Sequence, residues 1–150
     1  MADPDIRALT AKDIKAVVAL HAQGFEKGWP ESEMQTHIEN DLAMGCFSND
    51  AAPNLLGFIL IRIVYDQAEV LTLAVHPDTR RLGVARRLLD AVNIALKSGT
   101  VKSLFLEVAE DNLAAIALYK ASNFEAFGRR PAYYKRKDGR VAALNFAKRF

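Results

Sequence analysis

Apolar side chains in the first third of the chain recur every three to four residues, the period of a helix with one buried face. Thr10, with Asp13 three residues later, forms a capping pattern and predicts a first helix that ends at about Phe25. Pro30 predicts the start of a second helix, which runs from Glu31 into the low forties. The buried faces of the two helices hold Ile14, Val17, Val18 and His21, and Met34, Ile38 and Leu42, respectively.

Strands and helices alternate in the rest of the chain. Runs of Leu, Ile and Val predict strands at 55–65 and 68–75 with a turn at Asp66-Gln67, and a helix then opens near Gly83. The remaining predicted elements are a strand at 103–109, a helix at 112–122 and a hairpin that pairs 124–134 with 141–150 around Asp138-Gly139. This order predicts one α/β (α+β) domain over residues 1–150, in which about four helices flank a mixed central β-sheet.

The composition fits one globular domain and excludes several other classes of protein. The chain has 150 residues, of which 51% are hydrophobic and 25% charged. Its longest apolar run, Leu55–Ile61, is far shorter than the roughly 20 residues of a membrane helix, and the N-terminal residues show no signal-peptide pattern. One cysteine, Cys46, and three scattered histidines give no metal-ligand spacing. We therefore expect a cytoplasmic protein with no metal and no membrane partner.

Charge is unevenly distributed, although the net charge is only +2. Residues 1–50 hold nine acidic side chains against four basic ones, whereas residues 129–150 hold eight basic side chains against one acidic one. This asymmetry fits either a cationic substrate at the acidic end or two solvated faces. No basic run is interleaved with aromatic residues, so direct nucleic-acid binding is not expected.

The segment Arg80-Arg81-Leu82-Gly83-Val84-Ala85 leads from a predicted strand into a helix and fits a phosphate-binding turn. The first turn of a helix has unpaired N–H groups and the positive end of the helix dipole, and Gly83 removes the side chain that would block an anion there. The alternative is a glycine that only eases a tight turn. The sequence has neither the P-loop pattern nor the dinucleotide pattern Gly-x-Gly-x-x-Gly.

Two further residues are candidates for proton transfer. Alternation along 103–109 places Glu107 on one face with Phe105 and Ala109, and a partly desolvated carboxylate is a competent general base near neutral pH. Its alternative role is that of a structural partner for an arginine. Tyr119 lies in an apolar helix, where a tyrosine is otherwise a core residue. If the strand and helix are packed neighbours, both side chains reach the sheet edge at which the Gly83 helix begins.

Together these residues carry a family resemblance. Arg80-Arg81-Leu82-Gly83-Val84-Ala85 resembles the acetyl-CoA signature of the GNAT-type N-acetyltransferases. The later order of Leu106-Glu107-Val108, Asn112, Ala117-Leu118-Tyr119, Arg129-Arg130, Tyr133-Tyr134 and Asp138-Gly139 is similar to the RimI-like ribosomal-protein-alanine N-acetyltransferases. The resemblance covers about residues 5–140.

The resemblance implies a fold, an activity and a set of site residues. It implies transfer of an acetyl group from acetyl-CoA to the N-terminal amine of a protein, with a ribosomal protein among the acceptors. In this reaction Glu107 is implied to be the base and Tyr119 the acid. The implied cofactor-binding residues are Leu73, Ala74, Val75, Arg80, Arg81, Leu82, Gly83, Val84, Ala85 and Asn112. The implied substrate-binding residues are Phe25, Trp29, Glu69, Tyr133 and Tyr134.

One departure from the subfamily pattern bears on the acceptor. The acidic pair that usually follows Asp138-Gly139-Arg140 is replaced by Val141-Ala142, and Glu69 is a partial substitute. Acceptors other than a protein N-terminus, namely lysine or a small amine, therefore stay open. A non-catalytic acyl-CoA-binding module is the alternative from another class, and the presence of both Glu107 and Tyr119 argues against it.

Overall fold

The computed structural model describes residues 3–25 and 28–150. Its strands are β1 (Asp5–Ala8), β2 (Leu42–Phe47), β3 (Leu55–Val64), β4 (Gln67–Val75), β5 (Ser103–Ala109), β6 (Glu125–Arg136) and β7 (Gly139–Arg149). Its α-helices are α1 (Ile14–Gly24), α2 (Glu31–Asn40), α3 (Val84–Lys97) and α4 (Leu113–Ala121), and short 3-10 turns precede α1 and α3.

The strands form one mixed sheet in the order β1-β2-β3-β4-β5-β7-β6. Neighbouring strands pair antiparallel except β4 and β5, which are parallel. A parallel pair needs a crossover connection, and α3 supplies it. The fold class predicted from the sequence is confirmed.

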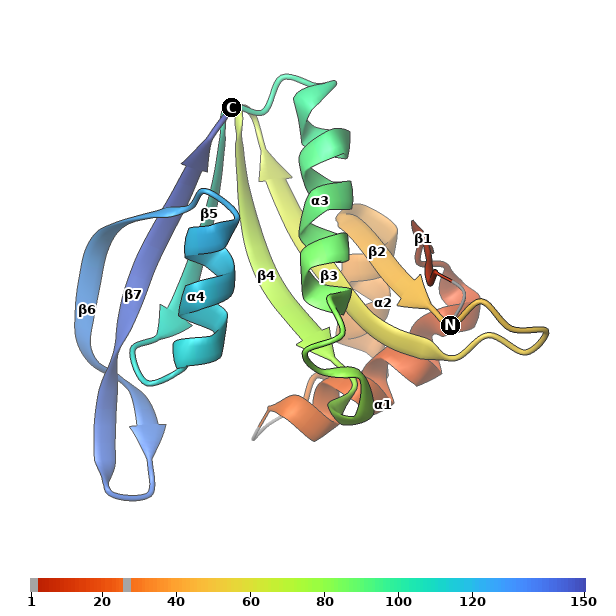
Figure 1. Ribbon diagram of the computed structural model, residues 1–150, viewed down its shortest axis with the longest axis horizontal. Coiled ribbons are helices and arrows are strands. Elements are labelled where there is room, and N and C mark those ends of the chain that lie inside the picture. The colour runs from red at the N-terminus through yellow and green to blue at the C-terminus, as the bar shows by residue number, and fades with distance from the viewer. Residues whose placement is uncertain (1–2, 26–27) are drawn as a thin grey trace.

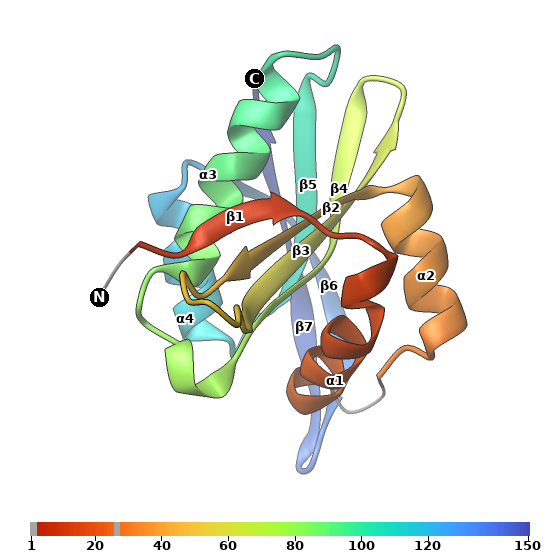
Figure 2. The same ribbon diagram turned by 90° about the vertical axis from the view of Figure 1, so that its right-hand side faces the viewer.

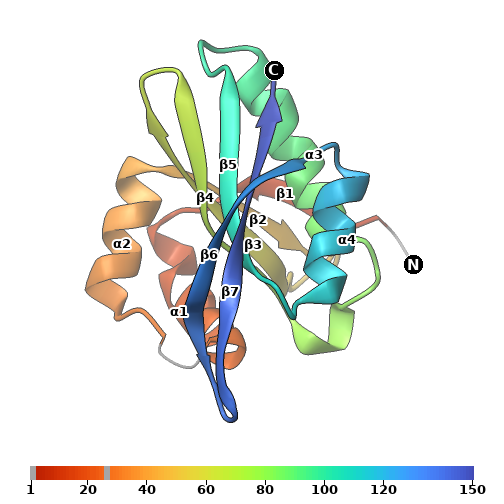
Figure 3. The ribbon, with the colours of Figure 1, turned by 90° about the vertical axis from the view of Figure 1, so that its left-hand side faces the viewer.

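Helices cover the two faces of the sheet in different places, as Figures 1 and 2 show. On one face, α3 and α4 bury a core that includes Leu88, Val92, Leu104 and Phe146. On the other face, α1 and α2 pack over β2, β3 and β4, and the β6–β7 hairpin projects beside them (Figure 3). The part of this second face formed by β5 and β7 has no helix over it in the views, and we call it the open face.

The predicted helices and all five predicted strands are present, but β1 and β2 were not predicted. The helical spacing of Met34 and Ile38 continues to Leu42, yet α2 ends at Asn40 and Leu42 is the first residue of β2, so the prediction of Leu42 on a helix face was wrong. The Asp41 side chain pairs with His37, and its extended backbone turns the chain into the strand. The four residues of β1 make an edge strand too short to give a pattern.

Both hairpin turns are displaced from their predicted positions. The β3–β4 turn lies at Tyr65-Asp66, with Tyr65 at a positive φ of 57°, one residue earlier than predicted. The β6–β7 strands extend further than predicted, to the pair Arg136 and Gly139.

The capping pattern before α1 is confirmed and is joined to the sheet. Asp13 accepts a hydrogen bond from the Thr10 N–H at 2.8 Å. It also forms a bidentate ion pair with Arg7 of β1, with N–O distances of 2.9 and 3.0 Å. These hydrogen bonds, above all those of the Arg7 guanidinium, hold the pKa of Asp13 below its ordinary value.

No helix among the described residues is long and apolar enough to cross a membrane.

Candidate active site

The central strands of the sheet separate in the middle of the molecule. Parallel pairing of β4 with β5 covers only Gln67–Glu69 and Ser103–Phe105. Beyond this pairing β4 continues to Val75 and β5 to Ala109, and Figure 1 shows the two strands diverging toward their carboxyl ends. Backbone groups of Leu73 and Val75 on the β5 side are therefore not used in β4–β5 pairing, and they can bind an extended ligand, whereas the Ala74 carbonyl faces β3.

The predicted phosphate-binding turn is the amino end of α3. Gly83 caps this helix with φ at +82°, a left-handed conformation that favours glycine, and its Cα faces open space. The first intrahelical bond runs from the Arg87 N–H to the Gly83 carbonyl at 3.0 Å, so the preceding amides of the first turn have no intrahelical acceptor. The first turn has no acidic side chain, and Arg80 and Arg81 are exposed beside it. This end of α3 is suited to an anion.

Glu107 lies on the open face, as the strand alternation predicted. Its neighbours Leu106 and Val108 are buried against α3 and α4, whereas the Glu107 side chain is 28% exposed. Its carboxylate oxygen Oε1 lies 2.9 Å from Nη2 of Arg130 on β6. Asn145 of β7 stands directly opposite Glu107 in the strand register.

Tyr119 lies on the other side of the sheet, in the core beneath α4. It is 8% exposed, and its ring packs against Phe124 and Phe146 with centroids 5.7 and 6.5 Å apart. Burial, with a smaller contribution from Tyr134, raises the pKa of Tyr119 to about 12. The hydroxyl therefore stays protonated at neutral pH.

Tyr134 lies close enough to both predicted catalytic residues to affect their titration or be affected by it. Burial raises the pKa of Tyr134, and the charge of Glu107 raises it further. The same Tyr134 also contributes to the raised pKa of Tyr119. Tyr134 thus lies near both residues, although among the described residues no hydrogen bond joins Glu107 to Tyr119.

A bulge in β6 sets the positions of Tyr133 and Tyr134. Arg130 pairs with Ala143 and Tyr134 with Val141, so the residues between them are opposed by a single residue of β7. Ala132 in this bulge has a positive φ of 51°. The rings of Tyr133 and Tyr134 meet edge to face at 5.0 Å.

Asn112 has a local structural role. It is the N-cap of α4, and its Oδ1 accepts a hydrogen bond from the Ala115 N–H at 3.2 Å. Contact of Asn112 with the cofactor stays a prediction.

Phe25 and Trp29 belong to an aromatic stack at the end of α1. The His21 ring lies 4.3 Å from Phe25 and 4.7 Å from Trp29, and Trp29 also lies 4.7 Å from His37 of α2. Burial lowers the pKa of His21, and its Nδ1 accepts a hydrogen bond from the Trp29 N–H at 3.4 Å. The stack connects α1 to α2, and a role for Phe25 and Trp29 in substrate binding stays a prediction.

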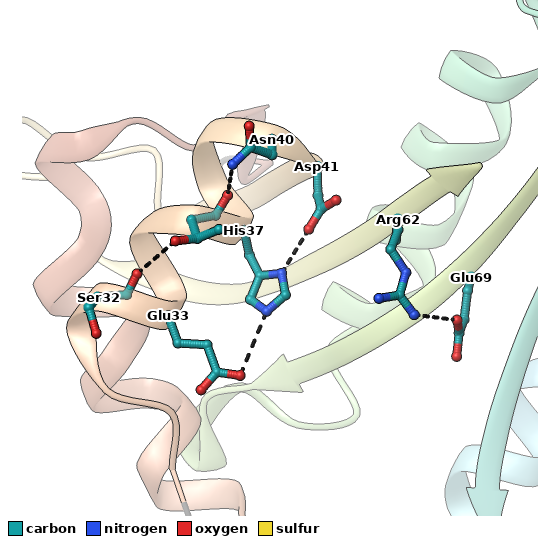
Figure 4. Close-up of polar contacts among 8 residues, drawn as sticks. Ser32, Glu33, His37, Asn40, Asp41, Arg62 and Glu69 are labelled. Atoms are coloured by element: carbon teal, nitrogen blue, oxygen red, sulfur yellow. Dashed lines mark hydrogen bonds and ion pairs between the residues drawn. The ribbon is translucent and has the colours of Figure 1, made fainter. Parts of the chain in front are cut away.

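Glu69 of β4 lies opposite Phe105 of β5, at the border of the open face, and is paired with Arg62 at 3.0 Å. Figure 4 shows this pair on the strands and the polar contacts of α2 nearby, where His37 lies 2.7 Å from Asp41 and 3.9 Å from Glu33. A hollow of about 440 Å³ beside the pair is lined by Arg62, Val64, Gln67, Ala68, Glu69 and Phe105.

Arg130 and Asn145 are site residues to which sequence reasoning assigned no role. Arg130 was part of the Arg-Arg pattern before the tyrosines, but its contact with Glu107 depends on the pairing of β6 with β7 and of β7 with β5. These pairings join residues far apart in the chain, so only a correct register of the hairpin could have identified the two residues.

Comparison with known proteins agrees with this arrangement. A family model described as the acetyltransferase (GNAT) family matches residues 14–124. The [ribosomal protein bS18]-alanine N-acetyltransferases of Escherichia coli K12 and Salmonella typhimurium are 38% and 35% identical to this chain over 143 residues, in each case 95% of both chains.

Solved structures give the same result. The crystal structure of the ribosomal-protein-S18-alanine N-acetyltransferase from E. coli superposes with a TM-score of 0.88 and 30% identity, covering 97% of this chain and 93% of that chain. Arabidopsis thaliana NAA60 in complex with acetyl-CoA, at 19% identity, shares the fold with a TM-score of 0.84 and covers 98% of each chain. The family-model match over most of the sequence, together with these relatives, shows that the chain belongs to the acetyltransferase (GNAT) family.

Proposed function

We propose that this protein transfers the acetyl group of acetyl-CoA to the N-terminal α-amine of a protein, with a ribosomal protein as the acceptor. The observation that carries the proposal is the position of Glu107 on the open face of β5, next to the place where β4 and β5 diverge. Identity to bS18-alanine N-acetyltransferases over 95% of the chain supports the choice of acceptor.

The cofactor is proposed to lie along the carboxyl end of β4 and across the amino end of α3. Backbone amides from Arg81 to Ala85 hold its diphosphate, because the first turn of α3 has free N–H groups and no acidic side chain. Leu73 and Val75 offer their backbone groups to the extended arm, and contact of Ala74 with the cofactor stays a prediction. Among the described residues no group of His, Cys, Asp and Glu is arranged to hold a metal ion, and the proposed reaction requires none.

Glu107 is proposed to take a proton from the acceptor amine as its nitrogen attacks the thioester carbonyl. The C–N bond forms, the C–S bond breaks, and the thiolate leaves. An α-amine has a pKa of about 8, whereas lysine has one of about 10.4, so a carboxylate base suits an N-terminus better.

Tyr119 is proposed to stabilise the departing thiolate. With a pKa of about 12, its hydroxyl is a weaker acid than a thiol, whose pKa is about 8.5, so complete proton transfer to the sulfur is uphill. A hydrogen bond to the developing negative charge has no such cost. We therefore assign Tyr119 as a hydrogen-bond donor to the thiolate, with the proton itself delivered from solvent.

Cys46 takes no part in this scheme. It is fully buried in β2, and burial raises the pKa of its thiol. Neither the thiolate nor access for a substrate is available, which favours direct attack by the amine in a ternary complex over an acetyl-cysteine intermediate.

The test is release of CoA thiol from acetyl-CoA in the presence of defined peptides. One peptide has a free N-terminal alanine and no lysine, and its matched control has a blocked N-terminus and one internal lysine. We expect the first to react and the second to remain unmodified by mass spectrometry. Acetylation of only the lysine peptide would overturn the assignment of the acceptor, and no reaction with any amine would overturn the activity.

A further inference from the structure

Arg130 reaches Glu107 across an intervening strand. Glu107, Asn145 and Gly128 form one row across β5, β7 and β6, and Ala109, Ala143 and Arg130 form the next row on the same open face. Gly128 has no side chain, and Ala143 is small and fully buried. The sheet surface between Arg130 and Glu107 is therefore low enough for the guanidinium to lie over it and come within 2.9 Å of Oε1.

The Arg130 guanidinium also lies over the aromatic ring of Tyr133. Its carbon lies 4.7 Å from the centre of the Tyr133 ring, which is placed there by the bulge with Ala132 at a positive φ. The preceding Arg129 points elsewhere, to Glu110, at 3.1 Å. Two consecutive arginines of β6 thus have different partners, and one of them is the proposed base.

Stability does not explain this arrangement well. The Arg130 side chain is 55% exposed, and ion pairs at this exposure contribute at most about 1 kcal/mol to folding. The effect on the carboxylate is more specific, because a carboxylate has two oxygens and Nη2 of Arg130 lies 2.9 Å from one of them, Oε1. A contact that holds Oε1 fixes the plane of the carboxylate and thereby the direction in which Oε2 points.

We propose that Arg130 is a positioning residue, which fixes the Glu107 carboxylate through Oε1 so that Oε2 faces the acceptor amine. This inference rests on the proposed function of Glu107 as the base. Tyr133 supports it by limiting the movement of the guanidinium. The competing role is that of a plug, in which the guanidinium occupies the place of the amine and must be displaced by it.

The experiment compares Arg130→Gln, Arg130→Lys and Tyr133→Leu with the control Arg129→Gln, which removes an equally exposed arginine paired with Glu110. If Arg130 positions the base, Arg130→Gln lowers kcat by about 10- to 100-fold while KM for acetyl-CoA changes less than about twofold. Arg130→Lys, which keeps the charge, restores part of kcat, and Tyr133→Leu gives a smaller loss of the same kind.

Two results would overturn the proposal. One is a kcat of Arg130→Gln equal to that of Arg129→Gln, and the other is an increase in turnover, which a plug would give. Thermal unfolding of all four variants separates these effects from loss of fold. The variants are measured on whichever amine the wild-type protein acetylates, so a wrong assignment of the acceptor leaves this comparison intact.

Discussion

Replacement of Gly83 tests the anion site at the amino end of α3. Any residue with a Cβ is strained at the φ of +82° found there, and this strain costs about 1–2 kcal/mol of folding free energy. Apart from the two adjacent residues, no atom lies within 4 Å of the position that a Cβ would take, so a Cβ at this site meets open space. Gly83→Ala therefore shows the effect of strain, and Gly83→Glu adds charge and bulk to the same strain.

The difference in Kd for acetyl-CoA between the two variants measures the repulsion between a carboxylate at position 83 and the bound diphosphate. A carboxylate about 6 Å from each of two phosphate charges, in an environment of effective dielectric constant about 40–80, opposes binding by roughly 1.4–2.8 kcal/mol in total. This corresponds to about a 10- to 100-fold increase in the Kd for acetyl-CoA relative to Gly83→Ala.

Titration calorimetry with acetyl-CoA measures these affinities, and thermal unfolding checks that both variants lose similar stability. The difference in Kd should shrink at high salt, because the site is exposed. Equal Kd values for Gly83→Ala and Gly83→Glu would refute a diphosphate at this helix end.

Three further predictions concern Tyr119 and Asp13. Tyr119→Phe should lower kcat by about 10- to 100-fold in the thiol-release assay with an unchanged Kd for acetyl-CoA, since only a hydrogen-bond donor is lost, and equal turnover would make Tyr119 a packing residue. Because the folded-state pKa of Tyr119 is raised to about 12 from 10, its contribution to stability is complete below pH 10 and is lost as the pH rises through 12. Urea unfolding should therefore show an alkaline loss of the order of 2–3 kcal/mol in the wild type that is absent from Tyr119→Phe, and parallel curves would contradict the burial of the hydroxyl. Asp13→Asn should lower the free energy of unfolding by about 1–2 kcal/mol at neutral pH. Because the pKa of Asp13 is lowered in the folded state, this loss of stability should disappear as the pH falls below 3.8, the ordinary pKa of the carboxyl. A loss that does not depend on pH would argue against the pair with Arg7.

The sequence predicted the elements whose signals are local. The helix after Gly83 has a strong apolar face and a glycine at its start, and α3 begins at Val84 as expected. The alternation that placed Glu107 apart from Leu106 and Val108 also holds in β5. These features depend on backbone geometry over a few residues, so a short window of sequence contains them.

Features that depend on pairing between distant segments were not predicted. β2 contains Gly45 and Met44, and it follows a helix whose apolar spacing continues to Leu42, so only its partners β1 and β3 define it as a strand. The ion pair of Arg130 with Glu107 requires the register of three strands and the bulge before Tyr134. Likewise, the separation of β4 from β5 results from sheet geometry and has no signal in either strand alone.

The most direct test of the account is a crystal structure of this protein with bound acetyl-CoA. We predict the diphosphate on the backbone amides of residues 81–85, the arm along Leu73–Val75 between the diverging strands, and the thioester on the side of the sheet from which Glu107 is accessible. A diphosphate bound away from the amino end of α3, or a thioester remote from Glu107, would contradict it.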